Sequence, residues 1–272
     1  MQTNAQTNVP RIVAVSSGKG GVGKTNFVTN IALILRSMQK RVLLMDADVG
    51  LSNIDIMFGI APKYNIKHLL SGEKSIKDII VKTSEGIDII PASSGIRELT
   101  QLTSVHKMKI IEELESIDND YDIFLIDTGA GISDNVTFFC SAAHDNIVIV
   151  TPEPTSIADA YALIKVLYKE HGETNFRIVV NNTKNHKEAK ETFRKLSMVA
   201  ERFLGITLDW LGALPYDEKI KEAVIAQKPY ITLYPTSDFS KKLIELAKQF
   251  LKRDVDLLKG GMQFFLKKSL SK

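Results

Sequence analysis

The sequence predicts a doubly wound α/β fold, in which a mainly parallel sheet is flanked by helices. Short runs of β-branched and aliphatic residues recur along the 272-residue chain, and segments long enough for helices separate them. Apolar residues within these runs are continuous instead of alternating. Continuous apolar character is typical of strands buried on both faces, and strands that alternate with helices are typical of a parallel sheet. A single domain of this class can bury a large core at this chain length.

Each expected element is one of these runs or a segment between two of them. The expected strands are 11–17, 41–46, 86–92, 122–127, 146–151, 176–181 and, more weakly, 209–215. The expected helices are 23–38, 53–58, 96–117, 133–143, 155–170, 185–204, 217–226 and 238–252. Residues 1–10 are polar and are expected to be disordered, 11–252 form the folded domain, and 253–272 are interpreted as a hinge with a terminal helix.

Composition predicts a cytoplasmic protein. The 44% hydrophobic and 25% charged residues are ordinary for a soluble globular chain. No apolar run reaches the roughly 18 residues of a membrane span, and residues 1–10 lack the features of a secretory signal. Cys140 is the single cysteine, which excludes an internal disulfide framework and fits a reducing compartment.

The net charge of +3 is concentrated near the end of the chain. From position 252 onward six basic residues accompany two acidic ones, so the remainder of the chain is close to neutral. A surface that binds DNA would need basic residues spread over one face. We therefore expect no direct nucleic-acid partner.

Residues 18–25, GKGGVGKT, match the phosphate-loop pattern G-x-x-x-x-G-K-[ST], with an apolar strand before them and an amphipathic helix after them. Inward-turned N–H groups and the helix N-terminus together form a cradle for phosphates. Lys24 is expected to reach the β- and γ-phosphates, and Thr25 to ligate Mg²⁺. A glycine-rich turn without a ligand is the alternative. The expected nucleotide contacts here are Gly18, Gly20, Gly21, Val22, Gly23, Lys24, Thr25 and Asn26.

Three carboxylates are expected near this loop. Asp46 and Asp48 lie at the carboxyl end of one expected strand, and Asp127 lies at the end of another. In open parallel sheets the ligand lies outside the carboxyl ends of the strands, where these residues and the phosphate loop should meet. Hydrolysis needs acceptors for the waters of the metal ion and a group that orients the attacking water. Asp46 or Asp127 could instead cap the turn that follows its strand.

The strand at 176–181 and the residues after it indicate which nucleotide base the site prefers. A guanine-reading element of the usual kind would place an aspartate three residues after Thr183, but His186 stands there. Asn181, at the strand end, can offer both a donor and an acceptor to adenine. ATP is therefore favoured over GTP, although an asparagine at a strand end is also an ordinary turn residue.

The motifs KGGVGKT with the additional Lys19, DADVGLSN and DTGAG resemble the deviant Walker A, switch I and switch II motifs of the MinD/ParA class of dimerising ATPases. TPEPTSIADAYALIK at 151–165 is similar to the FlhG (FleN, YlxH) group of that class, which governs flagellar number and placement. The resemblance extends from about residue 11 to residue 250.

The resemblance implies roles for individual residues. Lys19 would act catalytically in trans, by reaching across a homodimer to phosphates held by the other subunit, and Glu153 would contact the dimer interface. Asp48 would orient the water, and Gly129 would sense the γ-phosphate. Mg²⁺ would be held with the help of Thr25, Asp46 and Asp127, and adenine by Asn181, Pro215, Tyr216 and Asp217.

The terminal segment MQFFLKKSLSK has the pattern of an amphipathic helix. Exposed apolar residues opposite lysines suit an interfacial helix on anionic lipid, and the family resemblance implies the same. A last helix docked on the core of the domain is the alternative. The residues expected to touch the membrane are Met262, Phe264, Phe265, Leu266, Lys267, Lys268 and Leu270.

The resemblance implies an Mg²⁺-dependent ATPase, slow and stimulated by partners, that dimerises with ATP and associates reversibly with the inner face of the cell membrane. Its expected role is regulation of flagellum assembly, with an FlhF-type GTPase and basal-body or transcription-regulator proteins as partners. Residues 4–11, NAQTNVPR, depart from the group's D-Q-A-x-x-L-R activator motif, so stimulation of FlhF is not predicted.

Three other functions compete with this one. An iron–sulfur carrier is disfavoured because it needs paired cysteines. Positioning of a division site or of DNA by a MinD/ParA-type ATPase stays an alternative, as does a nucleotide-gated adaptor that hydrolyses little ATP.

Overall fold

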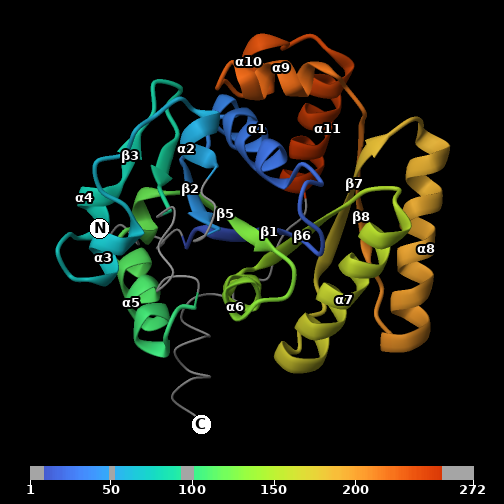
Figure 1. The fold of residues 1–272 in the computed structure, drawn as a ribbon, viewed down its shortest axis with the longest axis horizontal. Coiled ribbons are helices and arrows are strands. Elements are labelled where there is room, and N and C mark those ends of the chain that lie inside the picture. The colour runs from blue at the N-terminus through green and yellow to red at the C-terminus, as the bar shows by residue number, and fades with distance from the viewer. Residues whose placement is uncertain (1–8, 49–52, 93–100, 253–272) are drawn as a thin grey trace, which may run out of the picture.

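The computed structural model describes residues 9–48, 53–92 and 101–252. An eight-stranded sheet forms its centre, with the strand order β3-β4-β2-β5-β1-β6-β7-β8, and only β3 runs antiparallel to its neighbour (Figure 1). The strands are β1 Arg11–Ser17, β2 Val42–Ala47, β3 Val81–Lys82, β4 Asp88–Ile90, β5 Ile123–Ala130, β6 Asp145–Val150, β7 Phe176–Thr183 and β8 Asp209–Pro215. The predicted fold class is confirmed.

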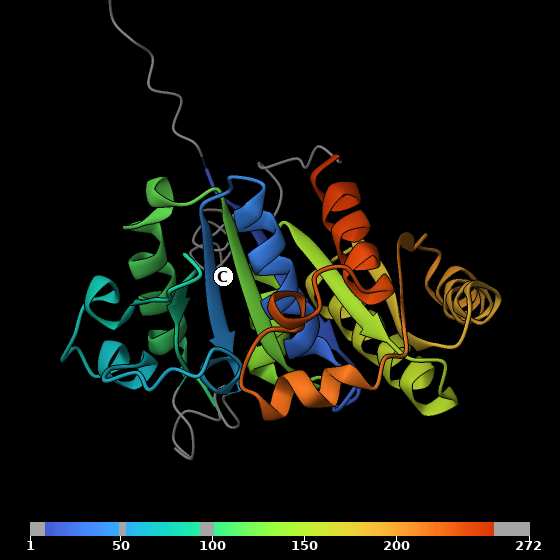
Figure 2. The ribbon, with the colours of Figure 1, turned by 90° about the horizontal axis from the view of Figure 1, so that it is seen from above.

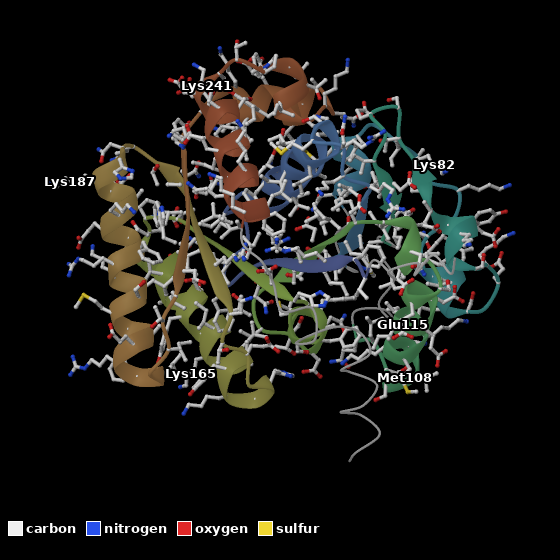
Figure 3. All side chains as sticks on the ribbon, turned by 180° about the vertical axis from the view of Figure 1, so that it is seen from behind. Lys82, Met108, Glu115, Lys165, Lys187 and Lys241 are labelled. Atoms are coloured by element: carbon white, nitrogen blue, oxygen red, sulfur yellow. The ribbon has the colours of Figure 1, made fainter. Side chains whose placement is uncertain are left out.

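Helices cover both faces of this sheet (Figures 1 and 2). On one face lie α1 Lys24–Ser37, α2 Ile54–Met57, α9 Lys219–Ile225, α10 Tyr230–Leu233 and α11 Asp238–Lys252. On the other face lie α3 Ile66–Leu70, α4 Ile76–Ile79, α5 Ser104–Glu115, α6 Asp134–Ala142, α7 Pro154–His171 and α8 His186–Leu204. A 3-10 turn at Asp118–Asp120 precedes β5. Charged side chains such as Lys187 on α8 and Lys241 on α11 project from the outer surface (Figure 3).

The apolar runs are continuous because the central strands contribute side chains to the cores on both faces of the sheet. In β1, Ile12 and Ala14 pack into the core under α5 to α8, whereas Val13 and Val15 pack into the core under α1 and α11. All four side chains are at most 3% exposed. A strand that has solvent on neither face needs no polar alternation, which is the physical basis of the prediction.

Two expected elements are shorter than predicted. The helix expected at 96–117 begins only at Ser104 within the described residues, because the Thr103 side chain accepts a hydrogen bond from the N–H of His106 and caps the helix there. The strand expected at 86–92 is confined to Asp88–Ile90, since Gly86 adopts a φ of 79° in the turn before it. The short elements α3, α4, α10 and β3 were not predicted.

A buried ion cluster closes the amino-terminal pole of the sheet. The Asp145 carboxylate lies 2.7 Å from Arg11 Nε and 3.0 Å from Arg177 Nε, and its side chain has no exposed surface. Arg11 also donates to the carbonyl of Phe250 at 3.1 Å and lies 4.0 Å from the centre of that ring. The cluster therefore attaches the end of α11 to the first residues of β1 and β6.

Three expectations concern the ends of the chain. Outside the described residues lie the hinge at 253–261, the membrane contacts from Met262 to Leu270, and residues 1–8 of the segment 1–10 that is expected to be disordered. Among the helices that the structure describes, none has the length and apolar character needed to cross a membrane.

Candidate nucleotide-binding site

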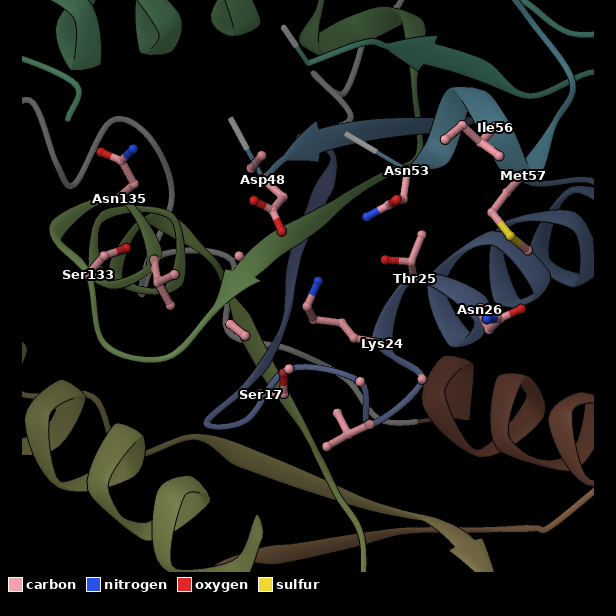
Figure 4. A pocket seen from close by; sticks show the side chains of 18 of the residues that line it. Ser17, Lys24, Thr25, Asn26, Asp48, Asn53, Ile56, Met57, Ser133 and Asn135 are labelled. Carbon is pink, nitrogen blue, oxygen red and sulfur yellow. The ribbon is translucent and has the colours of Figure 1, made fainter. Parts of the chain in front are cut away.

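A cavity of about 670 Å³ opens at the carboxyl-terminal edge of the sheet, where the ends of β1, β2 and β5 meet the start of α1. Lys24, Thr25, Asp48 and Asn53 surround one space in it (Figure 4). Of the predicted site residues, the structure brings nine to its lining: Gly20, Gly21, Val22, Gly23, Lys24, Thr25, Asn26, Asp48 and Gly129.

The predicted phosphate loop joins Ser17, the last residue of β1, to Lys24, the first residue of α1. Gly21 and Gly23 adopt φ values of 78° and 89°, a region that favours glycine. A Cβ on Gly23 would also lie 2.4 Å from Asn181 Nδ2. Because Gly23 has no side chain that could cap α1, the first N–H groups of this helix remain available to an anion in the cavity.

Lys24 is paired with Asp127 in the floor of the site. The Lys24 ammonium lies 2.6 Å from Asp127 Oδ1, and the two side chains are 9% and 2% exposed. Burial raises the pKa of the Asp127 carboxyl, while Lys24 and the Thr25 hydroxyl oppose that rise. The pair keeps a lysine at the bottom of the cavity even without a ligand, because neither charge can leave the other at low cost.

Asp46 and Asp127 are partners in the register of the adjacent parallel strands β2 and β5, so the predicted meeting of strand-end carboxylates is present in the structure. Asp46 is 2% exposed, and it accepts hydrogen bonds from the backbone N–H groups of Asp48, Asn53 and Ile54. Its carboxylate thus caps the start of α2. Asp48 itself lines the cavity beside Gly129.

Lys19 points away from its own phosphate loop. Its ammonium pairs with the Glu153 carboxylate and lies 3.3 Å from the Thr155 hydroxyl, at the start of α7. The Lys19 and Glu153 side chains are 39% and 61% exposed. Both residues assigned to the dimer interface therefore meet within one chain, at the rim of the site.

The residues expected to hold adenine lie on the other side of the loop. Asn181 Nδ2 donates to the carbonyl of Val22 at 2.7 Å, which leaves its buried Oδ1 without a hydrogen bond in the described part of the chain. Tyr216 is 53% exposed, and its N–H donates to the Thr183 carbonyl at 3.0 Å. Asn181, Pro215, Tyr216 and Asp217 thus share the adjacent ends of β7 and β8, outside the lining of the cavity.

The cavity also contains residues that the sequence reasoning missed. Asn53 belongs to the quoted motif DADVGLSN, and Ser133 and Asn135 follow DTGAG, so proximity to these motifs was the available signal. Val224 comes from α9, and only the tertiary structure brings it there. The other lining residues without a prior assignment are Ser17, Ala47, Ile56, Met57, Ala130 and Val136.

Replacing Gly18 with alanine is expected to lower the free energy of unfolding by roughly 1–3 kcal/mol. A Cβ at Gly18 would lie 2.1 Å from the backbone carbon of Asp159 in α7, so the loop or the helix must move. Gly20→Ala is the matched control, because a Cβ there meets no atom within 4 Å. Urea unfolding without nucleotide measures both variants. Equal midpoints would show that the loop does not pack on α7 in this way.

A glycine loop between a buried strand and a helix, with a buried lysine and strand-end carboxylates, defines a P-loop nucleotide-binding protein. Residues 10–180 match the AAA domain family. Together with the relatives described next, this match shows that the chain belongs to the MinD/ParA family of ATPases.

Two curated relatives are similar over most of the chain. The antiactivator FleN of Pseudomonas aeruginosa is 39% identical over 85% of this chain and 82% of its own length. The flagellum site-determining protein YlxH of Helicobacter pylori is 31% identical over 96% of this chain and 90% of its own. The resemblance to the FlhG group is therefore confirmed.

Solved structures agree with this assignment. The MinC:MinD cell division protein complex of Aquifex aeolicus matches with a TM-score of 0.72 and 28% identity, over 91% of this chain and 98% of that one. The septum site-determining protein MinD of Pyrococcus horikoshii, complexed with Mg-ADP, matches in fold with a TM-score of 0.75 and 23% identity, over 89% and 96% of the two chains.

Proposed function

We propose that this protein is an ATPase that dimerises when it binds ATP and regulates the number or position of flagella. The observation that carries the proposal is a second lysine, Lys19, at the exposed rim of an otherwise complete phosphate cradle. The printed functions of the two curated relatives, an antiactivator and a flagellum site-determining protein, support the flagellar role.

In the proposed reaction, water attacks the γ-phosphate of ATP and yields ADP and phosphate. Lys24 and the N–H groups at the start of α1 would hold the phosphates, and Asp48 would orient the water from the wall of the cavity. Thr25, Asp46 and Asp127 would hold Mg²⁺, which neutralises phosphate charge when bound. In the structure Lys24 pairs with Asp127. Binding of the nucleotide with Mg²⁺ must therefore separate the pair, so that Lys24 contacts the phosphates and Asp127 contacts the metal.

The orientation of Asn181 supports selection of adenine. One N–H of its amide nitrogen donates to Val22, and its buried oxygen, which has no hydrogen bond in the described part of the chain, is oriented to accept from a base. An oxygen accepts from the amino group of adenine, whereas it would face the carbonyl oxygen of guanine without a shared hydrogen. The expected preference is therefore for ATP.

Lys19 would act on phosphates bound by a second copy of the chain. It lies at the rim, half exposed and held by Glu153, so it can leave this partner at small cost. A cation supplied in trans stabilises charge on the transferred phosphoryl group, as an arginine finger does. Dimerisation would therefore be required for fast turnover.

Association with an anionic membrane would use the segment from Met262 to Leu270, whose pattern is that of an amphipathic helix. One such helix binds weakly, and a dimer that presents two of them binds far more tightly. ATP would thus control residence at the inner face of the cell membrane. An FlhF-type GTPase and flagellar basal-body or transcription-regulator proteins are the proposed partners.

Size-exclusion chromatography with light scattering, in ADP and in ATP with Mg²⁺, tests the central claim. Wild type is expected to be monomeric with ADP and dimeric with ATP. Lys19→Ala should still bind ATP but lose turnover by roughly 10²-fold or more, because the cation supplied in trans is missing. A wild type that stays monomeric with ATP would overturn the proposal. Dimerisation without measurable turnover, in the presence of lipid and partner, would favour the nucleotide-gated adaptor.

The second candidate function is the positioning of another cargo, such as the division site or DNA. A putative septum site-determining protein MinD of Emiliania huxleyi is 34% identical over 81% of this chain and 80% of its own length. Binding to anionic liposomes without binding to DNA would separate a membrane-based regulator from a DNA-partitioning one. The flagellar role itself is tested by counting flagella in cells that lack the protein.

A further inference from the structure

The phosphate end and the base end of the candidate site are joined by a short helix, α10. This four-residue helix, Tyr230–Leu233, contacts both α1 and α9, and Figure 1 shows it beside α9. It supplies no residue to the lining of the cavity. Its hydrogen bonds nevertheless reach both α1, which begins at the phosphate loop, and the segment Pro215–Asp217 that we assign to the base.

Asn30 attaches α10 to α1. Its side chain has no exposed surface, and its Oδ1 accepts from the N–H of Ile231 at 2.8 Å. Its Nδ2 donates to the carbonyl of Asn26, one turn earlier in α1, at 2.7 Å. The bond within α1 fixes the orientation of this buried amide, and its oxygen holds the first turn of α10 against the helix that follows the loop.

Tyr230 attaches α10 to the base segment. Its side chain is fully buried, and its hydroxyl donates to Asp217 Oδ2 at 2.6 Å. Asp217 Oδ1 accepts from the N–H of Lys219 at 2.9 Å, so both carboxylate oxygens are engaged by hydrogen bonds within the chain. Burial, and then the hydrogen bond to Asp217, raise the pKa of Tyr230 to about 12, so the phenol stays a donor at neutral pH.

We propose that Tyr230 is a positioning residue for the base: its hydroxyl holds Asp217, and Asp217 in turn holds the segment Pro215–Tyr216 beside Asn181. The inference rests on the proposed function and deepens it. It changes the role of Asp217 from a direct contact with adenine to a support for its neighbours. Asn30 keeps α10 on α1 whether or not the Tyr230 hydroxyl is present, so the phosphate cradle should not depend on that hydroxyl.

The test compares ligands with and without a base. Isothermal titration calorimetry on the full chain with Mg²⁺ measures the affinities for ATP, for GTP and for inorganic tripolyphosphate, which shares the phosphates but has no base. Tyr230→Phe is expected to weaken ATP binding by about 10-fold, the effect of one hydrogen bond to a charged group, and to leave tripolyphosphate binding unchanged. The preference for ATP over GTP should fall with it.

Tyr234→Phe is the matched control. The Tyr234 hydroxyl, next to α10, donates to the exposed Glu222 carboxylate at 2.5 Å and not to Asp217, so all three affinities should match wild type. Asp217→Asn is a second variant in case Tyr230→Phe does not fold. It weakens the acceptor of the same hydrogen bond, and the same selective loss of ATP affinity is expected.

The possible outcomes distinguish a failure of the inference about Tyr230 from a failure of the proposed function. Equal losses for ATP and tripolyphosphate would assign Tyr230 to general stability and overturn the inference. Unchanged ATP affinity in Tyr230→Phe, while wild type binds ATP, would also overturn it and leave the proposed function intact. A wild type that binds neither ATP nor tripolyphosphate would refute the proposed function and, with it, the inference.

Discussion

Replacing Lys24 with methionine is expected to lower the free energy of unfolding of the nucleotide-free protein by roughly 3–5 kcal/mol. The reason is the partner that remains, since Asp127 is 1% exposed and would keep a buried carboxylate without its cation. ATP turnover should fall by at least about 10²-fold as well, because the cation that holds the phosphates is removed. Urea unfolding and phosphate release measure the two effects separately.

The double variant Lys24→Met/Asp127→Asn is the control for the mechanism. Removing both charges leaves no unpaired ion, so most of the lost stability should return while turnover stays low. If Lys24→Met alone cost less than about 1 kcal/mol, as an exposed ion pair does, the buried pair would not exist in solution. The comparison distinguishes a structural cost from a loss of phosphate binding.

Replacing Asp145 with asparagine is expected to cost roughly 3–5 kcal/mol, although this residue lies at the pole of the sheet opposite to the nucleotide site. Its carboxylate is the shared partner of Arg11 and Arg177, whose side chains are 12% and 3% exposed. An amide cannot neutralise two buried guanidinium groups. Denaturant unfolding measures the loss, and the attachment of α11 to β1 should loosen with it.

Asp122→Asn is the control at the surface. Asp122 pairs with Arg41, which is 50% exposed, so its loss should cost less than about 1 kcal/mol at pH 7. The hydrogen bond from Arg41 lowers the pKa of Asp122, so this small contribution is present above the ordinary pKa of about 4 and disappears as the pH falls below it. Equal costs for the two substitutions would contradict the burial of Asp145.

Much of the fold could be predicted because its strands are buried on both faces. Residues 11–17 were expected as a strand with the bounds that the structure has, since an uninterrupted apolar run fits a central strand. The weaker expectation of a strand at 209–215, at the edge of the sheet, also has the right bounds. Short elements such as α10 escaped prediction, because four residues are too few to show a helical period. Within the described residues α5 begins only at Ser104, because the Thr103 side chain caps it there.

The candidate site, too, could be predicted only in part from the sequence. The loop 18–25 and the strand-end position of Asp127 followed from local order along the chain, because a phosphate cradle is built from consecutive backbone groups. The partner of each side chain could not be predicted from this local order. Lys24 and Asp127 are 103 positions apart, and Lys19 and Glu153 are 134 apart.

By itself, the sequence determined the fold class, the phosphate loop and the family to which the chain belongs, since these depend on local pattern and spacing. Only the tertiary structure decided that Asp46 caps α2, that Lys19 is held by Glu153 and that Asp217 is held by Tyr230. The physical reason is that a buried polar group must find a partner, and the topology of the sheet decides which distant residue is near enough to serve.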